Sequence, residues 1–76
     1  MTQSRTYRII LNEEPEGGFT VIVPSLPGCV TYGKDLKEAK EMAMEAIEGY
    51  IELLVEQGDP IPDDSNTLES AVTVAS

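Results

Sequence analysis

The fold of this chain is decided by residues 35–58, which read DLKEAKEMAMEAIEGYIELLVEQG. Apolar side chains recur here every three or four residues, which lines up one face of an α-helix. Asp35 is placed to cap this helix, with Glu38 as the second half of a capping box, and Gly58 followed by Pro60 ends it. Such a helix is about 33 Å long. The apolar positions, which need a sheet or another helix to cover them, are Leu36, Ala39, Ala43, Ala46, Ile47, Tyr50, Leu53 and Leu54.

The opposite side of the predicted helix carries a stripe of negative charge. No lysine or arginine occurs after Lys40, so cations are missing from the i,i+4 positions that usually pair with such carboxylates. One interpretation is a solvated helix face. The other is a surface for a basic protein, which would relieve the repulsion between like charges. This acidic stripe consists of Glu38, Glu41, Glu45, Glu48, Glu52 and Glu56, and under the second interpretation we expect Glu41, Glu45, Glu48 and Glu52 to contact the partner.

The composition restricts the class of protein. Seventy-six residues make one small domain with a marginal core, for which self-association is a natural remedy. The net charge is −9, and all of it comes from residues 41–76, so nucleic acid and anionic membranes are improbable partners. No apolar run is long enough to span a bilayer, and the polar start is not a signal peptide. With Cys29 as its single cysteine, the chain is expected in the reducing cytoplasm.

Two β-strands are predicted before the helix, at residues 7–12 and 19–23, because both are rich in β-branched and aromatic residues. The proline and glycines between them predict a hairpin. Alternation places Ile10 and Ile22 on the face away from the helix, where they are either partly exposed or covered by a partner chain, and we favour self-association through them. The face that seats the helix contains Tyr7, Ile9, Leu11, Phe19, Val21 and Val23.

A third strand is predicted at residues 29–32, after a type II turn with Pro27 and Gly28 at its centre. Leu26 on this turn is expected to lie over a core edge. Residues 58–68 read as an irregular connection, and residues 69–74 as a possible last strand. The predicted fold is therefore α+β, in the order β-β-β-α-β, an antiparallel sheet with one long helix packed on one face. We expect a single domain over residues 1–76 with an ordered core at about 6–57.

The residues needed for most catalytic sites are absent. The chain has no histidine, which removes Ser-His and Cys-His pairs and imidazole ligands, and it has no phosphate-binding loop. The remaining option is a Mg²⁺ site of carboxylates, using Glu13, Glu14 and Glu16 or the helix glutamates. These carboxylates lie in one turn or along one helix and do not converge. We therefore predict no enzyme activity, no cofactor and no metal, with a carboxylate-dependent hydrolase as a remote alternative.

Four segments resemble the HicB-type antitoxin domain: EGGF at residues 16–19, VPSLPGCVTYG at 23–33, LKEA at 36–39 and GDPIP at 58–62. The resemblance spans roughly residues 7–74. It implies a partial ribonuclease-H-like fold without nuclease function, and association as dimers or larger oligomers. It also implies a partner, a small basic HicA-type toxin that cleaves messenger RNA and whose active site the antitoxin covers.

The sequence departs from this family in two places. Typical HicB antitoxins continue into a DNA-binding domain where this chain reaches Ser76, so we expect a short form without that domain. Ser25 stands where the family often has an acid. Our main hypothesis is a toxin-neutralising antitoxin; the alternative is a stand-alone oligomeric adaptor of the same fold without a toxin.

Overall fold

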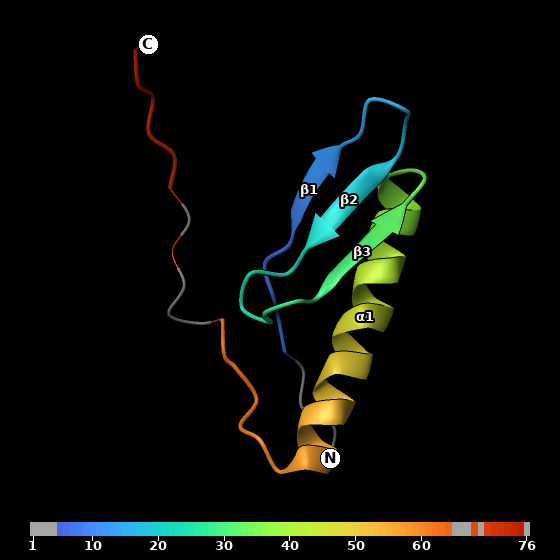
Figure 1. Ribbon diagram of the computed structural model, residues 1–76, viewed down its shortest axis with the longest axis vertical. Helices are drawn as coiled ribbons and strands as arrows, with labels where there is room; N and C mark the ends of the chain where they lie inside the picture. Colours follow the sequence, from blue (N-terminus) through green and yellow to red (C-terminus); the bar gives the residue numbers. More distant parts are fainter. Residues whose placement is uncertain (1–4, 65–67, 69, 76) are drawn as a thin grey trace.

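The protein folds as a three-stranded sheet with one long helix across one face (Figure 1). The computed structural model describes residues 5–64, 68 and 70–75. Its elements are β1 (Ile10–Glu13), β2 (Phe19–Ile22), β3 (Val30–Gly33) and α1 (Leu36–Gln57). Both strand pairs are antiparallel, in the order β1-β2-β3. The predicted α+β class and the seating of the helix on the sheet are confirmed.

The first strand is shorter than the predicted one. We predicted residues 7–12, whereas β1 begins at Ile10. In the observed register Ile10 pairs with Ile22, so Arg8 would stand opposite Pro24, which has no N–H to donate to a ladder. The backbone N–H of Arg8 instead donates to the side chain of Asp64, at 2.7 Å. Pairing therefore starts at Ile10, two residues after Arg8.

Both ends of α1 lie where the sequence placed them. The Asp35 side chain accepts a hydrogen bond from the Glu38 N–H at 2.8 Å, and the Glu38 carboxylate accepts one from the Lys34 N–H at 2.9 Å. At the other end Gly58 adopts φ 73°, and the N–H of Asp59 reaches back to the carbonyl of Leu54 at 2.9 Å. These bonds satisfy groups that the helix itself leaves unpaired.

The core consists of two adjoining clusters. Val21, Ala39 and Ala43 are buried between the sheet and the first half of α1. The second half of α1 packs on residues of the β2–β3 connection, where the Leu26 side chain is buried. The predicted turn is confirmed, because the Cys29 N–H donates to the Leu26 carbonyl and Gly28 has φ 81°. The second cluster contains Val23, Leu26 and Cys29, with Tyr7, Ile9, Ala46, Ile47 and Tyr50 packed against it.

The buried face of α1 is narrower than predicted. Leu36 and Leu53 were assigned to it, yet each is 51% exposed. The helix is about 33 Å long, whereas a four-residue strand spans only about 13 Å, so the sheet cannot cover both helix ends. The helix also packs mainly on β3 and less on β2. Positions at its first turn and near its end therefore meet solvent.

The chain after α1 is irregular over residues 59–64. No strand is assigned to residues 70–75, so the predicted last strand is not paired in this structure, and its residue 69 lies outside the described residues. A strand requires a neighbour to receive its backbone hydrogen bonds, and composition alone does not supply one. Among the residues described, no helix is long and apolar enough to cross a membrane.

Candidate partner-binding surface

The outer face of α1 is an exposed acidic surface. Glu41, Glu45, Glu48 and Glu52 are all exposed, as the acidic stripe predicts. Glu38 is partly buried because its carboxylate caps the helix. Arg8 forms an ion pair with Asp64, and no basic residue follows Lys40 along α1. The charge on α1 is thus available to a partner.

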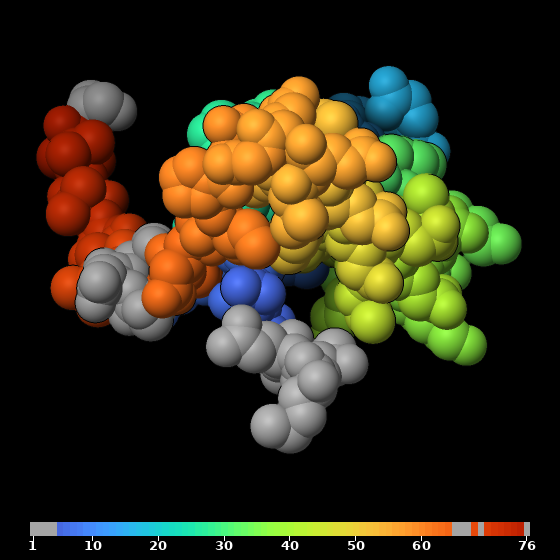
Figure 2. Space-filling view, turned by 90° about the horizontal axis from the view of Figure 1, so that it is seen from below, coloured from blue at the N-terminus to red at the C-terminus, as the bar shows by residue number. Residues whose placement is uncertain are grey.

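Apolar side chains border the acidic stripe. Met44 and Val55 are exposed. A shallow hollow runs along the last two turns of α1, and Figure 2 shows these turns (yellow to orange) at the surface. A surface that mixes apolar contacts with charged rims is typical of protein interfaces. The hollow is lined by Gly49, Ile51, Glu52, Leu53, Val55 and Glu56.

The face of the sheet opposite α1 is open and mostly apolar. Ile10, Ile22 and Val30 are direct cross-strand neighbours, so they form one row, with Ile10 and Val30 exposed. Thr20 and Tyr32 belong to the next row. The structure thus places Ile10 and Ile22 side by side on the face predicted for them. Neither of these rows contains a charged side chain, which distinguishes this face from that of α1.

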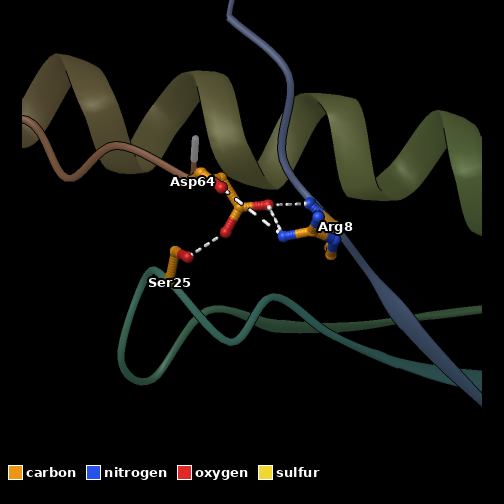
Figure 3. Close-up of polar contacts among 3 residues, drawn as sticks. All are labelled: Arg8, Ser25 and Asp64. Carbon is orange, nitrogen blue, oxygen red and sulfur yellow. Dashed lines mark hydrogen bonds and ion pairs between the residues drawn. The ribbon is translucent and has the colours of Figure 1, made fainter. Parts of the chain in front are cut away.

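A buried carboxylate joins three distant segments of the chain (Figure 3). Asp64, only 7% exposed, accepts hydrogen bonds from the Arg8 N–H and from the Ser25 hydroxyl. The Arg8 guanidinium lies 3.7 Å from the same carboxylate. The Tyr7 hydroxyl adds a 2.7 Å hydrogen bond to the Pro62 carbonyl. We call the group of Arg8, Ser25 and Asp64 the Asp64 clasp; it fixes the segment after α1 against the start of the sheet.

Sequence reasoning missed the Asp64 clasp. Asp64 stood among other polar residues of a proline-rich connection, and Ser25 was noted only as a departure from the family pattern. No periodicity links residues this far apart in sequence. Two observations could have indicated the contact. Ser25 stands where the family often has an acid, and acidic residues follow the helix.

The carboxylates and the thiol considered for chemistry lie in different surroundings. Glu14 receives a hydrogen bond from the Thr20 hydroxyl, while Glu13 and Glu16 are exposed. In the part of the chain that the structure covers, no three side chains of metal-binding type converge. Cys29 is buried, and its desolvation raises the pKa of the thiol above its usual value, which disfavours the nucleophilic thiolate.

Comparison with known families identifies the domain. A family model described as the HicB-like antitoxin of bacterial toxin-antitoxin systems matches residues 7–75. The chain belongs to this HicB-like antitoxin family. The match covers the sheet, α1 and the Asp64 clasp, and it confirms the resemblance noted in the sequence.

Relatives of this HicB-like chain occur in archaea and bacteria. A UPF0150 protein of Thermoplasma acidophilum is 44% identical over 78% of this chain and 86% of its own length. A UPF0150 protein of Synechocystis is 38% identical over 79% of this chain and 76% of its own. A protein named Antitoxin HicB 1, from Photorhabdus laumondii, is 36% identical over 74% of this chain and 36% of its own length.

Proposed function

We propose that this protein neutralises a HicA-type, messenger-RNA-cleaving toxin by binding it and covering its active site. Family membership supports the antitoxin role. The observation that carries the choice of surface is the exposed row of glutamates on α1, which lies beside exposed apolar side chains. A basic protein would be attracted to these carboxylates and would then bury the apolar contacts. We place the toxin on Glu41, Glu45, Glu48 and Glu52.

The proposed contact can be tested with charge reversals. In the first variant, Glu45, Glu48 and Glu52 are changed to lysine. In the control, three exposed acids outside α1, Glu13, Glu16 and Asp59, are changed to lysine, which alters the net charge by the same amount. Association with a catalytically inactive HicA-type toxin is then followed over a range of ionic strength.

We expect the reversals on α1 to slow association by about tenfold or more at low salt and to weaken its salt dependence. The control should change the rate much less, because charge opposite the partner steers it more than distant charge. Equal effects of the two variants would mean that only net charge matters, and would refute the α1 surface. Toxin binding itself would remain established in that case.

We further propose that the protein acts in the cytoplasm and self-associates through Ile10 and Ile22. The cross-strand row formed by these isoleucines is apolar and free of charge, so chains of net charge −9 can approach there with less repulsion than along α1. Changing both isoleucines to lysine should shift the protein toward monomer in sedimentation. An unchanged molecular weight would refute this face.

Two further experiments test the alternative functions. If the chain binds no HicA-type toxin and fails to restore growth when co-expressed with one, the oligomeric adaptor is favoured. Family membership supports a non-catalytic protein, and a nuclease assay with Mg²⁺ or Mn²⁺ tests this. Turnover that is lost on Glu13→Gln would establish the carboxylate-dependent hydrolase instead.

A further inference from the structure

The helix α1 contains a glycine that its own fold does not require. Gly49 lies within the 22-residue helix and is exposed. Apart from the neighbouring backbone of α1, no described atom lies within 4 Å of the place that a Cβ would take there. A glycine inside a helix is destabilising relative to alanine, because it loses more conformational freedom on folding. The packing of this domain therefore does not explain why a side chain is missing at this position.

The missing side chain belongs to the hollow on the last two turns of α1 (Figure 2, yellow to orange). Gly49 lines this hollow together with Glu52, Leu53 and Glu56. These three residues follow Gly49 by three, four and seven positions, a spacing that places them on the same side of a helix. The hollow thus has bare helix backbone at Gly49, with apolar and acidic side chains beside it.

The apolar part of the hollow is left uncovered by the rest of the domain. Leu53 is 51% exposed, because the sheet is too short to reach it. Val55, which also lines the hollow, is 62% exposed. Burying such side chains against a partner would be favourable. The hollow therefore offers apolar contact to a protein that binds α1.

The acidic part of the hollow is uncompensated. Glu52 and Glu56 are exposed, and their separation by four residues makes them neighbours on the helix surface. The chain has no lysine or arginine after Lys40, so no cation of α1 stands one turn from either carboxylate. Like charges at this spacing repel one another. A cation placed between the two carboxylates would relieve that repulsion.

These features match one kind of partner side chain. It needs an apolar stem to lie on Gly49 and Leu53, and a cationic end to reach the carboxylates. Lysine and arginine both combine a stem with a charge. Arginine fits two carboxylates better, because its planar guanidinium carries five N–H donors and is more weakly hydrated than an ammonium. Arginine is also enriched at protein interfaces, whereas lysine is depleted there.

We infer that the hollow at Gly49 seats an arginine of the basic partner. The stem of this arginine lies across Gly49 and against Leu53. Its guanidinium lies between Glu52 and Glu56. The inference rests on the proposed function, because the arginine belongs to the protein that binds α1. It adds Gly49, Leu53 and Glu56 to the contact and names the group that they receive.

Two substitutions at Gly49 test this seat. Gly49→Leu fills the hollow, whereas Gly49→Ala adds only a methyl group. Both remove a helix glycine, so both should raise Tm by roughly 3–8 °C. With the catalytically inactive HicA-type toxin, we expect Kd to rise by about tenfold or more for Gly49→Leu and by clearly less for Gly49→Ala. A variant that is more stable yet binds less well has lost the seat and kept the fold. A Gly49→Leu chain that binds as tightly as the unchanged chain would overturn the inference.

A double-mutant cycle tests whether the hollow and the carboxylates hold the same group. Glu52→Gln with Glu56→Gln removes the charge of the seat. Glu13→Gln with Glu16→Gln is the control, since it changes the net charge equally at exposed positions outside α1. We expect the first pair to raise Kd by about tenfold or more and the control much less. Combined with Gly49→Leu, the first pair should add little, because the same arginine is already lost. Additive effects would mean that the hollow and the carboxylates bind different groups, and would overturn the inference.

The outcomes separate this inference from the proposed function. If Gly49→Leu binds normally while the lysine reversals at Glu45, Glu48 and Glu52 slow association, the toxin binds α1 without this seat and only the inference fails. If the unchanged chain binds no HicA-type toxin, the proposed function and the inference fail together.

Discussion

The Asp64 clasp gives the sharpest prediction about stability. Asp64→Ala removes the acceptor of the Arg8 N–H and of the Ser25 hydroxyl, and leaves both donors in a partly buried place. Hydrogen bonds to a charged group contribute about 1.5–3 kcal/mol, and a donor without a partner costs about 1–3 kcal/mol. The Arg8 ion pair adds little, because the arginine side chain is 39% exposed and its charge is screened by water.

The expected loss is therefore about 2–4 kcal/mol in the free energy of unfolding. For a domain of this size each kcal/mol lowers Tm by roughly 4–8 °C, so we expect a decrease of about 8–32 °C. Thermal melts followed by circular dichroism at the helix signal measure it, with Asp59→Ala as the control, because Asp59 is an exposed acid of the same connection. Ser25→Ala should cost about 1 kcal/mol, and its effect should be non-additive with Asp64→Ala. If Asp64→Ala melts within about 2 °C of Asp59→Ala, the clasp makes no net contribution.

The other predictions concern α1 and its surroundings. Leu54→Ala should lower the free energy of unfolding by about 2 kcal/mol, which is the low end for a buried leucine because Leu54 is partly exposed. Leu53→Ala should change it by less than about 0.5 kcal/mol, because Leu53 is exposed. Urea unfolding measures both values, and equal effects would show that the helix phase is wrong. Gly58→Ala should cost about 1–2 kcal/mol, because Gly58 has φ 73° and alanine is strained there; an unchanged denaturation midpoint would contradict it. The pKa of Cys29 is raised in the folded protein by burial, so its contribution to stability is complete below the ordinary thiol pKa and is lost as pH rises past that value. Cys29→Ala should therefore remove part of the stability loss above about pH 9, measured by urea unfolding at several pH values.

The sequence predicts local features of this fold well. The limits of α1 follow from Asp35, Glu38 and Gly58, because caps act through hydrogen bonds within a few residues. The turn at Pro27 and Gly28 follows from backbone conformations that those residues favour. The face of the sheet that seats α1 follows from alternation, which Val21 and Val23 obey.

The features that sequence reasoning missed depend on tertiary contacts. The exposure of Leu36 and Leu53 results from a sheet shorter than the helix, and periodicity carries no information about that length. The late start of β1 results from Pro24 and Asp64, which lie far from Arg8 in sequence. The acidic surface was located correctly because charge on one helix face is itself periodic.

The mismatch in length between α1 and the sheet divides the helix into two regions with different supports. Ala39 and Ala43 pack its first half on β2 and β3, so the amide hydrogens of these two buried residues should exchange with solvent only when the whole domain unfolds. Its last turns rest on the β2–β3 connection, to which the Tyr50 hydroxyl is bound through the Pro27 carbonyl at 2.8 Å. Loss of that connection would release the second half of the helix while the first half stays folded, so subglobal opening and cleavage by proteases should begin there.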